Sequence, residues 1–251
     1  MNLPRFFCPL ALSAGVSVDL PESAARHAAR VLRLRSGDDL TLFDGRGGEY
    51  AARIAQVERE RVRVDVLTWD ARECESPLAL TLVQALQAGE KMDLTVQKAV
   101  ELGVGRIVPV LARRSVVRLD GARAARRVEH WRGVAASACE QCGRNRVPDV
   151  AELQGLERWL AQPAPAGALR LMLAPGAGHT LATLAPPPPG SPIELLIGSE
   201  GGLAPEEMHA AAQAGFVAVG LGPRVLRTET AGLAALAAIH ARWGDFVAAG
   251  A

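Results

Sequence analysis

The sequence lacks the features that mark membrane and secreted proteins. No apolar run reaches the roughly 18 residues that a membrane-spanning helix needs. The amino-terminal stretch carries an early Arg5, but Pro4 and Pro9 interrupt it and no small-residue cleavage site follows. Apolar residues make up 49% and charged residues 22% of the chain, a mixture typical of a globular protein. We therefore expect a cytoplasmic protein that does not enter a membrane.

Cysteine is also scarce. Four cysteines in a chain of 251 residues do not form a disulfide framework of the secreted kind. Cys139 and Cys142 form a Cys-x-x-Cys pair, but a zinc site would need a second pair with metal-ligand spacing. A thioredoxin-like pair would stand at the start of a helix, whereas this one lies near the end of a predicted helix. We expect semi-buried helix cysteines and no metal site.

The chain has little net charge, +1, so the total says nothing about nucleic-acid binding. The distribution is uneven. Residues 106–146 hold ten arginines against three acids, and residues 147–251 hold five arginines against nine acids. An arginine-rich stripe beside an acidic half suits a polyanion that docks on one face. A solvated helix face in an arginine-preferring protein explains the stripe equally well.

The first part of the chain has the pattern of a small β-barrel. It contains a short helical stretch and three segments of alternating apolar and polar residues, at 21–34 and then at 39–43, 50–57 and 61–69. The polar stretch 71–77, which ends in a proline, predicts a domain boundary. We expect a first domain over 1–72 and a second domain over 77–251.

From residue 78 onward, apolar strand-like runs alternate with helical patterns, which predicts a parallel sheet with crossover helices. The predicted strands cover 78–86, 106–110, 169–174, 193–197 and 216–221. The predicted helices cover 92–102, 123–142, 205–214 and 228–243. The fold class that we expect is therefore α/β, with a small amino-terminal barrel.

A glycine-rich turn follows the predicted strand 193–197. Its sequence is Gly-Ser-Glu-Gly-Gly at 198–202, and Pro205 then begins a helix with acids in its first turn. Three glycines in five positions let the backbone approach a ligand that side chains would exclude. A phosphate would be repelled by Glu200 and by the acids at the helix start. The pattern favours a ligand that carries positive charge and no phosphate.

A second loop follows the next strand and reads Leu-Gly-Pro-Arg-Val-Leu-Arg-Thr-Glu-Thr-Ala at 221–231. Its Gly-Pro turn exposes backbone at the carboxyl end of a strand, where open α/β sheets bind ligands. Thr228 or Thr230 can cap the final helix. Two arginines and a glutamate within six residues are hard to assign to packing, although a capped helix with surface ion pairs is an alternative.

These paired segments closely resemble the signature of the SPOUT RNA methyltransferases, in particular the 16S rRNA (uracil-N3)-methyltransferase family. The segments 84–93, 97–104 and Glu140-Gln141 with Arg144 and Pro148 also look like the catalytic domain of that family. Arg5-Phe6-Phe7 and the segment 27–33 look like its PUA-like RNA-binding domain. The resemblance covers nearly the whole chain. One departure is Ser199, where the commoner form of the first loop has proline.

The resemblance implies a trefoil knot near the carboxyl end, S-adenosyl-L-methionine bound among the knot loops, and a homodimer that acts on 16S rRNA or the small ribosomal subunit. General topology rules would predict no knot. The cofactor-binding residues that we expect are Leu173, Ile197, Gly198, Glu200, Gly201, Gly202, Val219, Leu221, Gly222, Val225, Leu226 and Thr228. The expected RNA-binding residues are Arg5, Arg26, His27, Arg30, Arg33, Arg113 and Arg114.

Two residues are candidates for the chemistry. Arg227 can stabilise negative charge that develops on the uracil carbonyl oxygens, as an oxyanion donor does. Glu229 is either a base or a residue that orients Arg227.

Three alternatives remain open at this stage. A SPOUT enzyme can act on tRNA or on a ribose 2′-hydroxyl. A non-catalytic RNA-binding protein would use the barrel and the arginine stripe, but it leaves the two loops without a role. A Rossmann dinucleotide enzyme is favoured only by weak glycine clusters near 45–48 and 176–178 that lack the full fingerprint.

Overall fold

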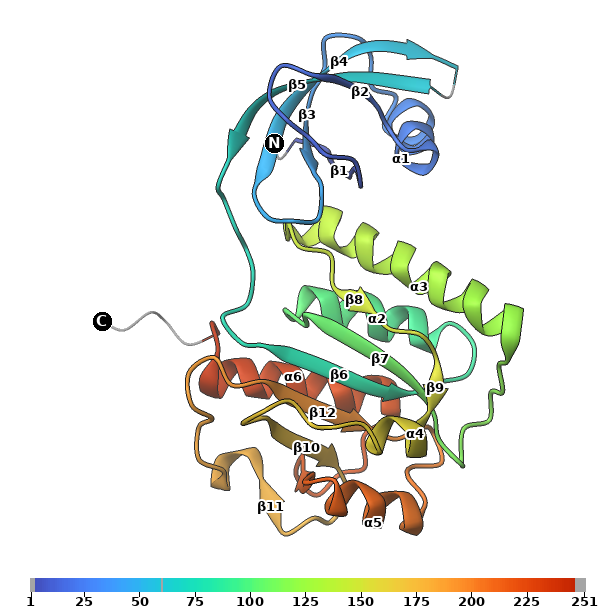
Figure 1. Cartoon of the computed structure of the whole chain (residues 1–251), viewed down its shortest axis with the longest axis vertical. Helices are drawn as coiled ribbons and strands as arrows, with labels where there is room; N and C mark the ends of the chain where they lie inside the picture. Colours follow the sequence, from blue (N-terminus) through green and yellow to red (C-terminus); the bar gives the residue numbers. More distant parts are fainter. Residues whose placement is uncertain (1–2, 60, 247–251) are drawn as a thin grey trace. The chain divides into compact units, whose positions relative to one another are not determined.

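The computed structural model describes residues 3–59 and 61–246, which form two compact units (Figure 1). The first comprises Met1–Glu75 and Ala136–Val147, and the second comprises Ser76–Ala135 and Pro148–Ala251. The chain leaves the first unit within the polar stretch 71–77. Residues 136–147 also belong to the first unit, which the sequence patterns do not predict. Residues 1–2, 60 and 247–251 of the predicted domains lie outside the described residues.

The first unit is built on a mixed five-stranded sheet with the order β1-β3-β4-β5-β2. Its strands are β1 Arg5–Phe7, β2 Ser17–Asp19, β3 Asp39–Phe43, β4 Glu49–Glu58 and β5 Arg61–Asp70. β1 pairs with β3 in parallel and the other pairs are antiparallel. Over the described residues the pairing runs from β1 at one end of this order to β2 at the other.

One face of this sheet carries the core of the first unit. Buried residues alternate with less buried ones over Asp39–Leu42 of β3 and over the first half of β5, where Leu40, Leu42, Val62 and Val64 are buried, because successive side chains of a strand point to opposite faces. The helical segment α1 Glu22–Arg26, which continues as a turn of π-helix over His27–Val31, adds buried alanines such as Ala28 to the same core. The opposite side of that helical segment is left in solvent.

The segment 136–147 is held in the first unit by two carboxylates. Oε1 of Glu140 accepts a hydrogen bond from the backbone N–H of Phe7 at 2.9 Å. Glu75 binds the Arg144 guanidinium through Oε2 at 2.7 Å and accepts the backbone N–H of Asn145 through Oε1 at 3.1 Å. Glu140 and Arg144, which the sequence comparison groups with the catalytic domain, therefore lie in the first unit.

The second unit contains a parallel sheet with the order β11-β13-β10-β12-β6-β7-β8, and β9 also pairs with β7. The strands are β6 Leu80–Ala85, β7 Arg106–Leu111, β8 Asp149–Val150, β9 Gln154–Gly155, β10 Leu169–Leu173, β11 His179–Thr180, β12 Ile193–Ile197 and β13 Val217–Gly220. Five of them match the predicted strands to within two residues. The two-residue strands β8, β9 and β11 are too short to produce a periodic pattern.

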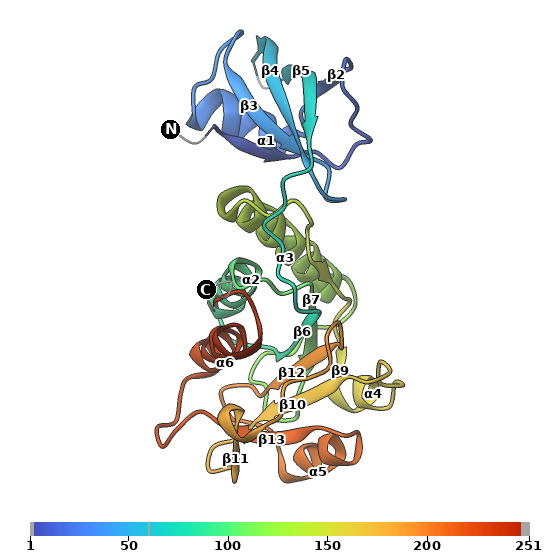
Figure 2. The same ribbon diagram turned by 90° about the vertical axis from the view of Figure 1, so that its left-hand side faces the viewer.

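Helices cover both faces of this sheet (Figure 2). The helices are α2 Lys91–Glu101, α3 Gly121–Cys142, α4 Leu156–Leu160, the 3-10 turn η2 Leu181–Thr183, α5 Pro205–Gln213 and α6 Thr228–Trp243. α4 and α5 pack on one face through Leu156, Trp159 and Ala211, and α2 and α6 lie against the other. Every residue of β12 is buried because both faces are covered.

All strands of the second unit run parallel, so their carboxyl ends meet at one edge of the sheet. The connections that follow β6, β10, β12 and β13 leave from this edge. Both glycine-rich loops are among them, and open α/β sheets place ligands at this edge. Among the described residues, no helix has the length and apolar character to cross a membrane.

Candidate functional site

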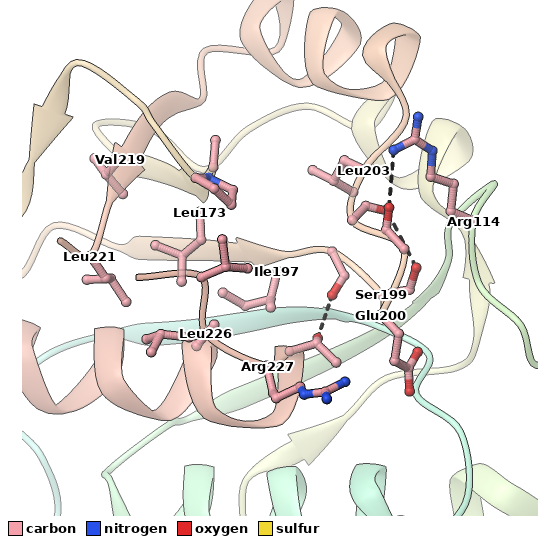
Figure 3. Close-up of a pocket in the computed structure, with 18 of the residues that line it drawn as sticks. Arg114, Leu173, Ile197, Ser199, Glu200, Leu203, Val219, Leu221, Leu226 and Arg227 are labelled. Carbon is pink, nitrogen blue, oxygen red and sulfur yellow. Dashed lines mark hydrogen bonds between the residues drawn. The ribbon is translucent and has the colours of Figure 1, made fainter. Parts of the chain in front are cut away.

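A cavity of about 570 Å³ opens at the carboxyl edge of the second sheet (Figure 3). Its walls come from the loops after β12 and β13, the end of β10, one residue after β7 and the first turns of α5 and α6. The lining residues are Arg114, Leu173, Ala174, Pro175, Ile197, Gly198, Ser199, Glu200, Gly201, Gly202, Leu203, Met208, Val219, Leu221, Gly222, Arg224, Val225, Leu226, Arg227, Thr228 and Ala231. The cavity has the size of an ordinary small-molecule site.

The first loop, residues 198–202, is a crowded turn. The backbone N–H of Gly202 donates to the carbonyl oxygen of Ser199 at 2.8 Å and closes the turn. A Cβ atom on Gly198 would lie 2.9 Å from the backbone of Gly202 and of Leu203, and a Cβ on Gly201 would lie 2.9 Å from the Cβ of Arg114. Glycine at 198 and 201 is therefore a steric requirement of this turn.

A chain of buried polar side chains is hydrogen-bonded to the backbone of the first loop. The Thr228 hydroxyl donates to the carbonyl oxygen of Gly198 at 2.6 Å and accepts from Nε2 of Gln84 at 3.2 Å. Nε2 of Gln87 lies 3.4 Å from the same hydroxyl, and Gln87 is held in turn by the Thr95 hydroxyl at 2.9 Å. The start of α6, the end of β6 and the first loop are thus joined by one polar network.

The cavity has an apolar end and a charged end. Leu173, Ile197 and Leu221 lie toward one side in Figure 3, and Glu200 and Arg227 lie toward the other. Oε1 of Glu200 accepts the backbone N–H of Ala88 at 2.9 Å. Such a division suits a ligand with a flat apolar group at one end and a polar, charged group at the other.

Of the two acids at the start of α5, Glu207 binds backbone N–H groups and does not line the cavity. Oε2 of Glu207 accepts the backbone N–H of Ala204, and its Oε1 accepts the backbone N–H of Arg113, both at 2.8 Å. Glu207 is buried and Glu206 lies outside the cavity wall. Glu200 is therefore the one acid of the first loop and the start of α5 that lines the cavity.

The second loop, residues 221–227, is much more open. Gly222 has φ +80°, a left-handed conformation that favours glycine, although a Cβ there would meet no neighbouring atom. Arg224, Val225 and Arg227 are exposed. Among the described residues, no side chain of this loop makes a hydrogen bond or an ion pair. The Arg227 guanidinium is therefore free to meet a ligand.

Glu229 lies in the first turn of α6, next to but not in the cavity wall. Its Oε1 lies 3.3 Å from Nζ of Lys91, and its Oε2 is buried with no hydrogen-bond partner among the described residues. Its own backbone N–H, and then the Lys91 ammonium and the Arg227 charge, hold the pKa of the Glu229 carboxyl below its usual range. A carboxylate with a lowered pKa is a weak proton acceptor.

All twelve residues predicted to bind the cofactor line this one cavity, and so does Arg227. Glu229 does not. From the sequence, Arg114 is predicted only as an RNA contact. No place in the cavity is predicted for Ala174, Pro175, Ser199, Leu203, Met208, Arg224 and Ala231. Ser199 and Arg224 stand inside the two motifs, so a signal for them was present. Met208 projects from α5, and no sequence pattern points to it.

Comparison with known proteins explains this arrangement. The family model described as an RNA methyltransferase domain matches residues 74–240, about two thirds of the chain. The chain belongs to this RNA methyltransferase family. A second model, for the PUA domain of RNA methyltransferases, matches residues 20–67, within the first unit.

Related proteins extend the match to nearly the whole chain. The "Ribosomal RNA small subunit methyltransferase E" of Mycobacterium bovis is 38% identical over 224 residues, which are 86% of this chain and 84% of that protein. The crystal structure of the enzyme of that name from Neisseria gonorrhoeae, bound to S-adenosyl methionine, has 44% identity and a TM-score of 0.92, with 98% of this chain and 100% of that chain covered. A putative methyltransferase of Legionella pneumophila, in complex with the same cofactor, has 35% identity and a TM-score of 0.91, with the same coverage.

In this RNA methyltransferase the predicted RNA-binding residues fall into two groups. Arg5 is not available to a phosphate, because its side chain is only 13% exposed, is paired with Glu49 and donates to Oδ1 of Asn145 at 2.6 Å. The structure thus gives Arg5 partners inside the first unit.

The other predicted residues of the first unit remain at the surface. Arg26, His27, Arg30 and Arg33 are exposed on or just after the helical segment 22–31, beside the exposed Val31. Arg26 pairs with Glu22 at 2.6 Å, an exposed pair within one helix that a phosphate can replace. This basic surface is the feature of the first unit that best suits RNA.

The two arginines of the second unit differ. Arg113 is paired with Glu157 at 2.6 Å and lies 3.8 Å from Glu206. Arg114 lines the cavity and donates to the carbonyl oxygen of Gly201 at 3.1 Å. Arg114 is therefore part of the cavity wall and is fixed to the first loop.

The cysteine pair of the RNA methyltransferase is semi-buried on a helix, as the sequence pattern predicts, whereas Cys74 is exposed. Cys139 is buried and Cys142 is half-buried at the end of α3, and burial raises the pKa of the Cys139 thiol to about 12. Over residues 3–59 and 61–246, no group of three or more histidines, cysteines, aspartates or glutamates is arranged to hold a metal ion.

Proposed function

We propose that this protein transfers a methyl group from S-adenosyl-L-methionine to N3 of a uridine in the 16S RNA of the small ribosomal subunit. The observation that carries the proposal is the single cavity formed by both family motifs at the carboxyl edge of the sheet. The relatives named for small-subunit rRNA methylation support it, as do two similar solved structures that hold the cofactor.

The residues present fit S-adenosyl-L-methionine. The apolar end of the cavity suits the adenine ring, and the crowded glycines at 198 and 201 leave backbone groups open to a ligand. Glu200, at the charged end, tolerates a cation and disfavours a phosphate. When bound, this cofactor supplies an electrophilic methyl group on a positively charged sulfur.

Methylation of N3 would form the new N–C bond while the bond between the methyl group and the sulfur breaks, and the N3 proton would pass to solvent. Negative charge would then spread onto the O2 and O4 oxygens of the ring. Arg227 lines the cavity with an unpaired guanidinium, so we propose that it donates to one of these oxygens. The lowered pKa of Glu229 favours an orienting role over that of a base. Accurate positioning of the two reactants supplies much of the rate in this scheme.

The proposed RNA platform of the first unit is Arg26, His27, Arg30 and Arg33, and Arg114 is the proposed contact in the second unit. Neutralisation of Arg26, Arg30 and Arg33 together should weaken 16S RNA binding and flatten its salt dependence by about two to three in slope, because fewer counterions are released. Cofactor affinity should not change. Fluorescence anisotropy at several salt concentrations measures both slopes.

The matched control is Arg5→Ala, combined with a thermal melt. Its effect should appear in the melting temperature, because Arg5 is buried in an ion pair. If Arg5→Ala lowers the salt slope as much as the triple variant does, the assignment of the two groups is wrong.

Calorimetry with S-adenosyl-L-methionine is the first test of the function, since a non-catalytic RNA-binding protein would not bind it. Mass spectrometry of RNA from a deletion strain then locates the product. Loss of 3-methyluridine from 16S rRNA supports the proposal. Loss of a tRNA modification or of a ribose methyl group would assign the protein to another class of SPOUT enzymes.

We also propose the trefoil knot. The connection from β10 to β12 carries β11, and β11 pairs with the outer edge of β13, whose inner edge pairs with β10. β13 comes later in the chain, so it enters between two segments that are already joined. When the chain is pulled from its two ends, a tightened knot would retain part of its length. The extended length would then be shorter than that of an unknotted chain, which spans about 3.3–3.6 Å per residue.

The oligomeric state and the location are proposals too. We propose a homodimer in which two subunits complete the site, and a cytoplasmic location, where ribosomal RNA is assembled. Light scattering coupled to gel filtration tests the dimer, and cell fractionation tests the location.

A further inference from the structure

Lys91 occupies an unusual place for a basic residue. It is the first residue of α2, where a positive charge opposes the helix dipole and an acid would be preferred. The chain contains only two lysines, Lys91 and Lys98, beside 26 arginines. A lysine at this place therefore serves neither the helix nor the general preference of the chain for arginine.

The contacts of Lys91 join the first loop to the start of α6. Its Nζ lies 3.3 Å from Oε1 of Glu229, at the start of α6, and 3.8 Å from Oε1 of Glu200, in the first loop. Oε1 of Glu200 also accepts the backbone N–H of Ala88, three residues before Lys91. The β6–α2 connection thus holds one carboxylate from each of the two family motifs.

A lysine ammonium suits this place. It is a compact charge with three donors, which can be shared between two carboxylates that approach from different elements. Two carboxylates and one ammonium leave one negative charge beside the cavity. Arg227, two residues before Glu229, is the nearby cation that balances it, and its charge contributes to the lowered pKa of Glu229.

We propose that Lys91 is a positioning residue for methyl transfer, which bridges Glu200 and Glu229 and so holds the first loop and the base of Arg227 in one fixed geometry. The proposal rests on the function proposed above. It assigns the β6–α2 connection a role in ordering the site, although Lys91 itself does not line the cavity.

Lys98 provides a matched control. It lies on the same helix and pairs with Glu101 at 2.7 Å, with similar exposure, 41% against 37% for Lys91. Lys98→Met removes a helix ion pair that has no contact with either loop. The comparison of Lys91→Met with Lys98→Met therefore separates the bridge from a general effect of losing one lysine.

The first experiment measures cofactor affinity and single-turnover methylation. Lys91→Met should weaken S-adenosyl-L-methionine binding about fivefold, the effect of losing a partly exposed charge pair. It should lower the methylation rate by a further factor of about ten because the backbone that carries Arg227 is no longer fixed through Glu229. Lys98→Met should match the unmodified protein in both. Lys91→Arg should recover most of the rate, since it keeps the charge.

The second experiment uses no activity readout. With 15N in the lysine side chains, the spectrum holds two Nζ signals, which the two methionine variants assign. Addition of S-adenosyl-L-methionine and the substitution Glu229→Gln should each shift the Lys91 signal and leave that of Lys98 unchanged. A Lys91 signal that responds to neither overturns the bridge.

The outcomes separate this proposal from the proposed function. If the unmodified protein binds the cofactor and methylates 16S RNA, but Lys91→Met equals Lys98→Met in affinity and rate, the role of Lys91 is refuted and the function stands. If the unmodified protein neither binds the cofactor nor methylates RNA, both proposals fail.

Discussion

The two loops that line the cavity differ in how tightly they are packed and hydrogen-bonded. The first loop, 198–202, is crowded by its own backbone and by Arg114, and it is held by hydrogen bonds from Thr228, Gly202 and Ala88. The second loop, 221–227, has exposed side chains that make no hydrogen bond among the described residues. The comparison teaches that the first loop is shaped before a ligand arrives, whereas the second presents groups that a ligand must engage.

The largest expected effect is in the first loop. Gly198→Ala places a Cβ 2.9 Å from two backbone atoms, in Gly202 and in Leu203, so the turn must open. We expect cofactor affinity to fall more than about a hundredfold, as in steric disruption of a preorganised site, while the circular dichroism spectrum is retained. Calorimetry measures this loss. A folded variant with unchanged affinity would contradict the view that the crowded turn forms the cofactor site.

The next effect concerns the second loop and should appear in the rate. Arg227→Lys keeps the charge but loses the planar fork that can meet a carbonyl oxygen and a carboxylate together. We expect a loss of roughly tenfold to a hundredfold in single-turnover rate, by analogy with the removal of one oxyanion donor. Cofactor affinity should change little. A loss of affinity without a loss of rate would make Arg227 a cofactor ligand.

Gly222→Ala tests the openness of the second loop. The new Cβ meets no atom, so only the left-handed backbone conformation is penalised, by about 1–2 kcal/mol. We expect cofactor affinity to fall by about fivefold to thirtyfold, and thus less than for Gly198→Ala. Equal losses in the two variants would show that both loops are equally preformed, and the contrast between them would disappear.

The smallest effect is expected for Glu229→Gln. Because the pKa of Glu229 is lowered, the carboxylate is ionised throughout pH 6–9 and an orienting role gives a deficit that does not vary with pH. We expect the single-turnover methylation rate to fall about threefold to fivefold, which corresponds to the free energy of a partly exposed charge pair. A deficit that shrinks as the pH rises and the uracil imide ionises unaided would instead identify Glu229 as the base.

Several features of the site could be read from the sequence because they are local. A buried strand that runs into Gly-Ser-Glu-Gly-Gly, and a second that runs into Gly-Pro-Arg, are written in consecutive residues, so all twelve predicted cofactor residues line the cavity. The strands and helices that flank these loops are long and strongly periodic. For the same reason β12 and α6 are found at the predicted residues.

Other features depend on residues that are distant in the chain. The helix α3 and the loop after it are continuous in sequence, but Glu75, Glu140 and Asn145 bind residues 136–147 into the first unit. Arg5 looks like a phosphate contact in the sequence, and only the fold reveals its partners Glu49 and Asn145. An ion pair between residues more than forty positions apart produces no periodic pattern in the sequence.

The sequence by itself determined the family motifs, the α/β pattern and the positions of the glycine-rich turns, because turn chemistry and hydrophobic periodicity act between near neighbours. Tertiary structure alone decided which charges are free to act. Glu207 became a helix cap, Arg5 an internal ion pair and Lys91 the bridge between two carboxylates, while Arg227 was left unpaired. The physical reason is that the partner of a charge is chosen by proximity in space, and the fold brings β6, β12 and α6 together at one edge of the sheet.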